Sequence, residues 1–327
     1  MTETRKSIYE ILNDEIMAME IPEEEKTKLL SALIRANSQK INLMIVGATG
    51  SGKSSTINAL FNMKMAEVGV GVDPETEIID KYELSNLTIW DTPGLGDNIE
   101  KDKITVQSIV EKLSEVDENN KMLIDLVLVV LDASSKDLST SYDFINKTLI
   151  PCLGGDNTHR ILIGINQSDM AMKGRHWDHE TNAPDSVLED FLKQKAESVR
   201  WRIHKATDVD VKPIYYCAGY MDDDGAQQSP YNLSKLFYYI MMSIPAEKRF
   251  VVVSNINTES DPWESNDDEM DYNEEIKEGF WSSVFSGFDS NIDKFAAIGT
   301  CIVGLPGMLV GAVIGGITEL FGKLIRR

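Results

Sequence analysis

The stretch Gly47-Ala48-Thr49-Gly50-Ser51-Gly52-Lys53-Ser54 decides the fold of this 327-residue chain. It follows the apolar run 41–46 and precedes a helix-like segment, residues 55–61. A strand that enters a helix through a glycine-rich turn directs several backbone N–H groups inward, and the helix dipole adds partial positive charge there. Glycine, lysine and serine at these fixed positions, between a strand and a helix, therefore predict a P-loop that binds phosphate.

Two elements together predict a phosphate and metal site. The expected phosphate contacts come from Gly47, Thr49, Gly50, Ser51, Gly52, Lys53, Ser54 and Ser55. Lys53 would reach the β- and γ-phosphates of a nucleotide, and the Ser54 hydroxyl would hold Mg²⁺. A second apolar strand ends in a D-x-x-G element, in which Asp91 would hold Mg²⁺ through water and the Gly94 N–H would touch a γ-phosphate.

Two later loops predict that the base is guanine. The buried strand 160–165 delivers Asn166, Gln167, Ser168 and Asp169 to its C-terminal edge, where α/β sheets bind ligands. Asp169 would accept from the guanine N1–H and exocyclic amine, a donor pair that adenine lacks. After the strand 211–216, the backbone N–H near Ala218 in the Cys217-Ala218 loop would meet the guanine O6. Each loop alone could be an ordinary polar turn, but four elements in this order favour a guanine nucleotide.

The spacing of apolar segments predicts an α/β fold with a doubly wound, mostly parallel sheet. The expected strands are residues 41–46, 78–84, 87–90, 124–132, 160–165 and 211–216, and they alternate with helical patterns at 102–116, 140–149, 186–205 and 232–243. The length suffices for one domain of about 200 residues with appendages.

The motifs resemble those of the translation-factor-related P-loop GTPases, and within them the Era-like group, over residues 40–247. The texts GATGSGKSSTINALF and DTPGLGD are similar to a bacterial family of 50S ribosome-binding-type GTPases that includes prophage-borne members. The resemblance implies Mg²⁺-dependent hydrolysis of GTP to GDP and phosphate. It also implies that Thr76 closes on Mg²⁺ and the γ-phosphate, so the expected catalytic residues are Lys53, Thr76 and Gly94, and the expected metal ligands are Ser54, Thr76 and Asp91.

Three departures from the family pattern bear on catalysis. Gln167 replaces the usual lysine of the base motif, which retains aliphatic packing over the purine but loses a charge. Leu95 stands where Ras-like enzymes carry the glutamine that orients the attacking water, and an apolar side chain cannot do this. Gly50 stands where many Era-like proteins place a potassium-binding asparagine, so potassium activation is not expected. We therefore expect slow hydrolysis that depends on an activating partner, a dimer or a membrane assembly.

The segments around this domain have distinct compositions. Residues 1–39 predict N-terminal helices whose apolar stripe packs on the domain or on the C-terminal tail, with a membrane or partner contact as the alternative. The GTPase domain would span residues 40–247, and residues 248–275 would form an acidic linker. Residues 259–278 hold ten acidic side chains and a single lysine, a composition that predicts a solvated segment.

Residues 276–327 predict a helical hydrophobic tail. Ile276, Phe280, Val284, Phe288 and Ile292 recur at steps of four, as in an amphipathic helix for a membrane interface or a protein groove. Residues 295–318 contain no charged residue and would extend about 36 Å as a helix, enough to cross a bilayer core. Gly307, Gly311 and Gly315 form a ridge that permits close helix approach. These patterns favour membrane association, with a soluble tail that packs on the N-terminal helices or self-associates as the alternative.

Composition restricts partners and location. A net charge of −21 with no basic, aromatic-rich stripe argues against direct nucleic-acid binding. The widely spaced cysteines form no metal or disulfide pattern, and the first residues lack a signal-peptide pattern. We therefore expect a cytoplasmic protein at the inner face of a membrane. Two functions fit: a GTP-hydrolysing switch at that membrane, or a GTP-binding switch or scaffold with negligible hydrolysis and a soluble, self-associating tail.

Overall fold

A computed structural model describes residues 7–18, 20–61, 63, 67–68, 79–96, 98–220, 228–257 and 263–285. The expected magnesium ligand Thr76 and the predicted tail from residue 286 onward lie outside the described residues.

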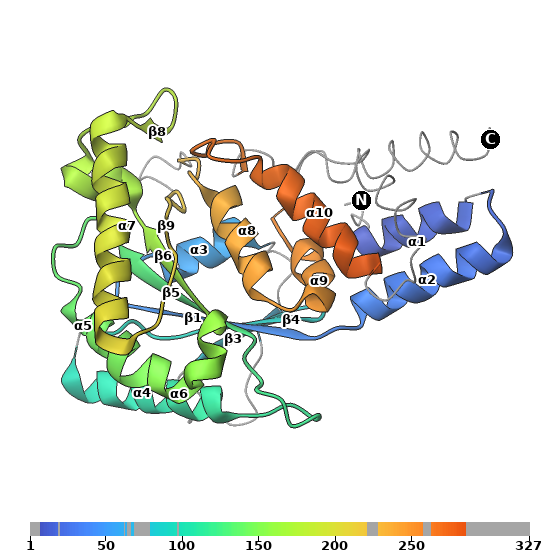
Figure 1. Ribbon diagram of the computed structural model, residues 1–327, viewed down its shortest axis with the longest axis horizontal. Coiled ribbons are helices and arrows are strands. Elements are labelled where there is room, and N and C mark those ends of the chain that lie inside the picture. The colour runs from blue at the N-terminus through green and yellow to red at the C-terminus, as the bar shows by residue number, and fades with distance from the viewer. Residues whose placement is uncertain are drawn as a thin grey trace.

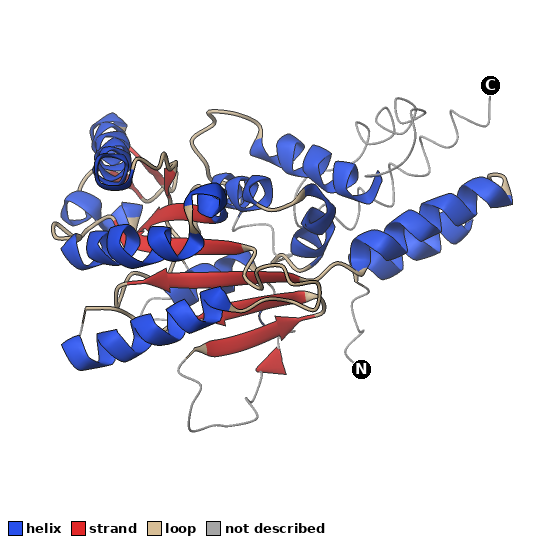
Figure 2. Cartoon of the chain, turned by 60° about the horizontal axis from the view of Figure 1, so that its bottom comes forward, coloured by secondary structure: helices blue, strands red, loops and turns tan. Residues whose placement is uncertain are grey.

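The centre of the molecule is a seven-stranded sheet in the order β2-β3-β4-β1-β5-β6-β9 (Figure 2). Its strands are β1 (Ile41–Gly47), β2 (Glu67–Val68), β3 (Asp80–Leu84), β4 (Leu87–Asp91), β5 (Leu126–Asp132), β6 (Ile161–Asn166) and β9 (Pro213–Tyr215). β1 pairs in parallel with β4 and β5, and β6 pairs in parallel with β5 and β9. Among the described strands of this sheet, β3 alone runs in the opposite direction, antiparallel to both β2 and β4, because a tight turn joins β3 to β4. The predicted mostly parallel sheet is confirmed.

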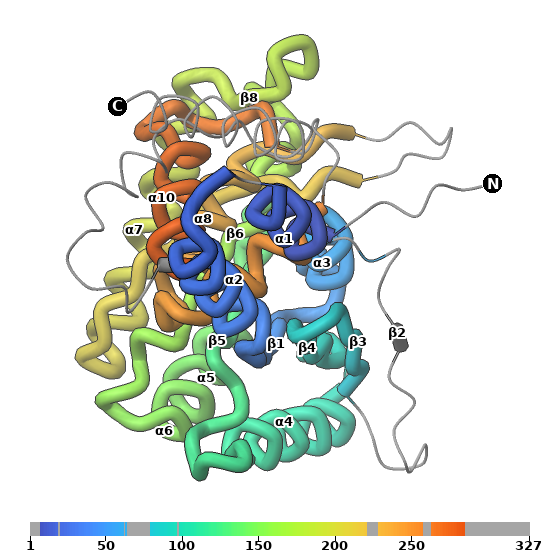
Figure 3. The backbone as a smooth tube through the Cα atoms, turned by 90° about the vertical axis from the view of Figure 1, so that its right-hand side faces the viewer, coloured from blue at the N-terminus to red at the C-terminus, as the bar shows by residue number. Residues whose placement is uncertain are grey.

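Helices cover both faces of the sheet, as Figures 1 and 3 show. One face carries α1 (Ile8–Ala18), α2 (Glu23–Asn37), α3 (Lys53–Leu60), α8 (Leu233–Ser243), α9 (Arg249–Ser254) and α10 (Tyr272–Phe285). The other carries α4 (Ile99–Ser114), α5 (Ser139–Phe144), α6 (Ile150–Leu153) and α7 (Ser186–Thr207). A π-helical turn (Ile145–Leu149) joins α5 to α6, two 3₁₀ segments (Gly155–Arg160 and Ser168–Gly174) flank β6, and Ala246–Lys248 precedes α9. A small hairpin, β7 (Trp177–Asp178) and β8 (Ala183–Pro184), precedes α7. The β1 strand is buried on both sides because it lies between two hydrophobic cores.

The acidic segment is not a solvated linker over its described part. Trp263 is buried, and the Asp267 side chain is only 1% exposed. The Asp267 carboxylate lies 2.5 Å from the Lys235 ammonium and accepts from the Tyr272 hydroxyl at 2.9 Å. The buried Lys235 on α8 and the adjacent Asn232, whose amide group also bonds to Asp267, therefore fix this acidic run to the domain, which composition alone does not predict.

The amphipathic helix is also placed differently from the expectation. Ile276, Phe280 and Val284 are buried against α8, α9 and α2, and the Phe280 ring stacks on Phe250 with centroids 5.2 Å apart. This apolar face of α10 completes a protein core and faces neither a bilayer nor a free groove. Among the described residues, no helix is long and apolar enough to cross a membrane.

Candidate nucleotide-binding site

The P-loop joins β1 to α3 through a backbone that requires glycine. Gly50 and Gly52 have φ values of 75° and 86°, in the left-handed region that other residues seldom adopt. A Cβ atom on Gly52 would lie 2.2 Å from the Asn166 Nδ2 atom, and one on Gly47 would lie 2.3 Å from the Val130 carbonyl oxygen. The loop is therefore packed tightly between the ends of β5 and β6, with Ser54 and Ser55 in the first turn of α3.

Lys53 lies beneath this loop. Its side chain is buried, and its ammonium donates to the carbonyl oxygens of Gly47 and Ala48, both at 3.2 Å. These bonds hold a positive charge at the mouth of the loop, where the helix N-terminus already favours anions. The predicted role of Lys53 as a phosphate contact is compatible with this position.

Asp91 and Ser54 form a pair suited to a divalent cation. The Ser54 hydroxyl donates to Asp91 Oδ2 at 3.1 Å, while the buried Asp91 Oδ1 atom has no hydrogen-bond partner among the described residues. Burial raises the pKa of Asp91, although the Ser54 hydrogen bond and the Lys53 charge oppose the shift. A hydroxyl beside an unsatisfied carboxylate oxygen is a hard donor set of the type that Mg²⁺ prefers, so these residues fit the expected ion.

The D-x-x-G element is joined to the P-loop by backbone hydrogen bonds. The Leu95 N–H donates to the Gly47 carbonyl at 3.2 Å, and the Thr49 N–H donates to the Leu95 carbonyl at 3.0 Å. A Cβ atom on Gly94 would lie 2.4 Å from the Thr49 Cα atom, so only glycine fits there. The Leu95 side chain is buried in the core, where it supports the loop and cannot contact a water molecule at the γ-phosphate.

Asn166 connects the base-recognition loops to the P-loop. Its Nδ2 group donates to the Ser51 carbonyl at 2.9 Å, and its Oδ1 atom accepts from the Ala218 N–H at 2.9 Å. Gln167, with φ of 62°, donates through Nε2 to the Gly50 carbonyl at 2.6 Å. The sequence predicted packing of Gln167 over the purine, and the hydrogen bond to the P-loop was missed because nothing in the sequence indicates that contact.

Asp169 and Cys217 lie side by side at the base end of the site. Both are buried, and the two side chains are close enough to interact electrostatically. Burial raises the pKa of the Cys217 thiol well above its usual value, and the Asp169 charge raises it further. The thiol therefore stays protonated beside the Asp169 side chain. This contact was not anticipated from the sequence, where Cys217 was expected only to border the base.

The remaining support comes from a residue that the sequence did not single out. The Tyr216 hydroxyl lies 2.7 Å from Thr56 Oγ1 inside the core, and the Tyr216 carbonyl accepts from the Ser168 hydroxyl at 2.7 Å. Tyr216 thereby fixes α3 and the base loop to the same strand end. The structure brings the predicted residues of the P-loop, Asp91, Gly94 and both base loops to one edge of the sheet.

Residues 42–167 match the family model described as 50S ribosome-binding GTPase. The chain carries a P-loop GTPase domain. The probable GTP-binding protein EngB of Mycoplasmopsis pulmonis is 26% identical to it over 148 residues, which cover 41% of this chain and 77% of that protein. The uncharacterised protein YkfA of Escherichia coli is 26% identical over 46% of this chain and 50% of its own length.

Septins also share part of the GTPase domain. Septin-8 of Xenopus tropicalis is 37% identical over 86 residues, which cover 24% of this chain and 20% of the septin. The chain thus spans about a fifth of the length of septin-8. Among solved structures, a probable GTP-binding protein engB aligns over 62% of this chain and 97% of its own, with 19% identity and a TM-score of 0.35.

Proposed function

We propose that this GTPase domain binds guanine nucleotide with Mg²⁺, hydrolyses GTP slowly, and acts as a switch at a membrane. The observation that carries the proposal is the Ser54 hydroxyl 3.1 Å from Asp91, whose second carboxylate oxygen is buried and has no partner in the part of the chain that the structure describes. A buried carboxylate with an unsatisfied oxygen is costly unless a cation is bound there. We also propose that this GTPase domain belongs to the Era-like group.

The chain's own residues divide the work of phosphoryl transfer. Mg²⁺, when bound by Ser54 and Asp91, supplies charge neutralisation at the phosphate oxygens. Lys53 adds a second positive charge, and the Gly94 N–H donates toward the γ-phosphate, with Thr76 as the proposed further ligand. The buried Leu95 orients no water, so the proposal requires an activating partner or assembly to supply that function.

The proposed membrane contact lies in residues 286–327. The α10 helix cannot provide it, because its apolar face is buried in the protein core. The charge-free stretch 295–318 and the basic residues that follow it are the sequence features that support membrane binding. We accordingly propose a location at the cytoplasmic face of a membrane.

A truncation after Phe285, the last residue of α10, tests this proposal. Full-length protein and residues 1–285 should bind GTP with equal affinity, because the nucleotide site is unchanged. With anionic liposomes, only the full-length protein should sediment in the liposome pellet. In single-turnover assays, the same liposomes should stimulate GTP hydrolysis only by the full-length protein. Full-length protein that stays in the supernatant in both nucleotide states would exclude the membrane role.

The burial of α10 supports a second function that the same assay separates from the first. The apolar face of α10, predicted to suit a membrane or a protein groove, packs on α8, α9 and α2 of the same chain. By the same chemistry, the rest of the tail would bind a protein surface, such as a second copy of this chain. In that case the chain is a GTP-binding switch or scaffold with a soluble, self-associating tail. Size-exclusion chromatography would then show oligomers that residues 1–285 do not form, with negligible turnover in either form.

Replacement of Asp169 tests the identity of the base. Asp169→Asn exchanges an acceptor for a donor, so we expect GTP affinity to fall by about ten- to a hundredfold, the effect of one or two charged hydrogen bonds. Affinity for xanthosine triphosphate should rise, because xanthine presents an oxygen at the position of the guanine amine. Equilibrium binding of both nucleotides to wild type and variant measures the change. Equal wild-type affinity for ATP and GTP would contradict the guanine assignment.

A further inference from the structure

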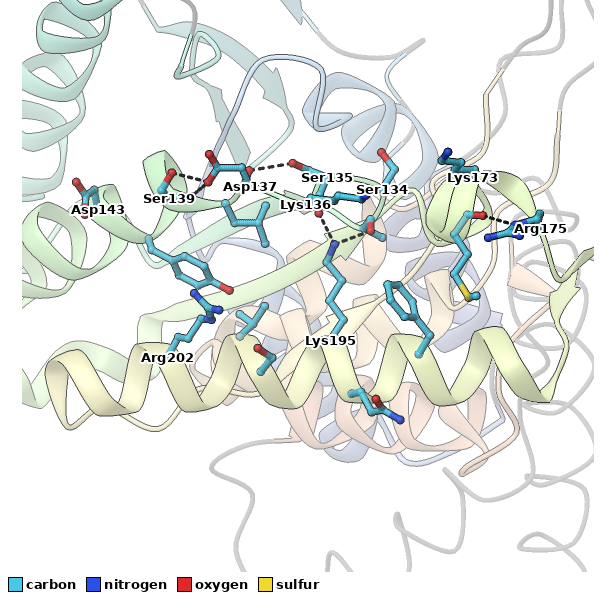
Figure 4. Close-up of a pocket in the computed structure, with 18 residues that line it drawn as sticks. Ser134, Ser135, Lys136, Asp137, Ser139, Asp143, Lys173, Arg175, Lys195 and Arg202 are labelled. Atoms are coloured by element: carbon cyan, nitrogen blue, oxygen red, sulfur yellow. Dashed lines mark hydrogen bonds between the residues drawn. The ribbon is translucent and has the colours of Figure 1, made fainter.

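A second cavity, of about 690 Å³, lies between the loop after β5 and helix α7 (Figure 4). Its walls are residues 133–143, parts of the segment 172–175, and one face of α7 from Phe191 to Arg202. Small-molecule sites typically occupy about 300–1,000 Å³. The described residues that line it include none from the P-loop or from the Asn166 to Asp169 segment, so this cavity is separate from the nucleotide site.

Positive charge converges on this cavity. Its five cationic lining residues are Lys136, Lys173, Arg175, Lys195 and Arg202. Within the part of the chain that the structure describes, none of the five forms an ion pair. The lining also holds two acids, so the cations outnumber them: Asp137 accepts from Ser139 within the lining, and Asp143 pairs with Lys147 outside it at 2.8 Å. Unpaired cations gathered in one place on a chain of net charge −21 favour an anionic ligand.

Lys195 lies at the centre of this group. Its side chain rises from α7 toward the β5 loop, where Nζ donates to the carbonyl oxygens of Ala133 at 2.5 Å and Ser135 at 2.7 Å (Figure 4). Burial lowers the pKa of Lys195, against the opposing charge of Asp132. An anion beside this ammonium would restore the stabilisation that burial removes.

The cavity also has an aromatic wall. The Arg202 guanidinium lies 5.5 Å from the centroid of the Tyr142 ring, a cation–π contact that holds both side chains in place. Phe191, which is 38% exposed, lines the same cavity. Flat apolar surface beside guanidinium and ammonium groups suits a ligand that joins an aromatic ring to phosphate.

The rim of the cavity has an unusual backbone. Met172 and Lys173 have φ values of 51° and 66°, in the left-handed region, and the Arg175 Nε group donates to the Met172 carbonyl at 3.2 Å. Consecutive left-handed residues other than glycine are strained and tend to occur where a function requires them. This conformation places Lys173 and Arg175 on the lining opposite α7.

We propose that this cavity binds a small phosphate-bearing ligand with an aromatic ring, such as a nucleotide, as a second site beside the GTPase site. The phosphates contact Lys195 and Arg202, the ring packs against Phe191, and Arg175 adds positive charge at the end of the cavity away from Arg202 (Figure 4). The floor of the cavity is linked to the GTPase site, because the Ala133 N–H donates to the Asn166 carbonyl at 2.8 Å.

Binding of ADP to protein already saturated with GDP and Mg²⁺ tests the proposal. Equilibrium dialysis with labelled ADP should give one saturable site, and pyrophosphate and adenosine should each compete more weakly than unlabelled ADP. Arg202→Glu should lose at least about tenfold in ADP affinity, as expected when a charged contact is reversed. The Arg202 side chain is exposed, so the variant should fold, and unchanged GDP affinity verifies this.

Lys205→Glu provides the matched control. Lys205 lies on the same helix, contacts Trp201 and does not line the cavity. ADP affinity within twofold of wild type in this control, with the loss confined to Arg202→Glu, supports the site. Absence of saturable ADP and pyrophosphate binding up to millimolar concentration overturns it, as does an equal loss in both variants, which would indicate general charge attraction.

Discussion

Lys53→Ala should reduce GTP hydrolysis by about a thousandfold or more, because it removes a buried positive charge from the phosphate site. The Lys53 ammonium lies between the Gly47 and Ala48 carbonyls and can turn toward phosphate oxygens without leaving the loop. Nucleotide affinity should fall with it, since the remaining N–H groups and helix dipole provide only partial charge. Single-turnover hydrolysis and equilibrium GDP binding measure the two effects.

Lys40→Ala is the control for this variant. Lys40 is exposed and immediately precedes β1, at the opposite end of the strand from the P-loop. Lys40→Ala removes one positive charge from the chain, as Lys53→Ala does, but should leave GDP binding and GTP hydrolysis within twofold of wild type. If Lys53→Ala kept more than a tenth of the wild-type rate, Lys53 would not be the phosphate contact.

Asp267→Asn should destabilise the protein by about 3 kcal/mol, or roughly a hundredfold in the unfolding equilibrium. The variant preserves shape but leaves the Lys235 ammonium, which is 6% exposed, without its buried partner. Glu269, at 2.7 Å from the same ammonium, is half exposed and compensates only in part. Urea unfolding in the absence of nucleotide measures the loss.

Asp268→Asn makes the same chemical change one residue away, on an exposed side chain, and should alter stability by less than about 0.5 kcal/mol. Equal stability of the two variants would show that the Asp267 ion pair contributes nothing.

Acid should reproduce the effect of Asp267→Asn in the wild type. Burial alone would raise the pKa of Asp267, but the hydrogen bond and charge of Lys235, together with the Tyr272 hydroxyl, lower it below its ordinary value. A lowered folded-state pKa stabilises the native state above the unfolded pKa of about 3.9, and this contribution is lost as pH falls through the folded value. The wild-type advantage over Asp267→Asn should therefore persist at neutral pH and shrink below about pH 4.

The sequence was sufficient for the mostly parallel sheet, apart from the short β2, and for the position of the P-loop between β1 and α3, because these depend on local patterns. Gly50 and Gly52 have the left-handed backbone that a glycine-rich turn predicts, and β1, β5 and β6 are the apolar runs that precede the motifs. Buried parallel strands are continuous apolar segments, so their positions are readable without knowledge of their neighbours.

Contacts between distant segments could not be predicted in this way. The acidic run is fixed by Lys235, and the apolar face of α10 is covered by α8, α9 and α2, although its spacing fits a membrane helix equally well. Gln167 likewise donates to the Gly50 carbonyl, and Cys217 lies beside Asp169. Both contacts join residues that are distant in the sequence. Composition describes the properties of an isolated segment, whereas the acidic run and α10 are placed by contacts with other parts of the chain.

The packing of α2 against α9 and α10 has a consequence for how the chain is made. Roughly 250 residues separate the end of α2 from the end of α10. At ribosomal rates of about 5–20 residues per second, α2 waits about 12–50 s for the end of α10. During synthesis the side of α2 that contacts α9 and α10 is thus uncovered, and the last turns of α10 complete the core on this side of the sheet.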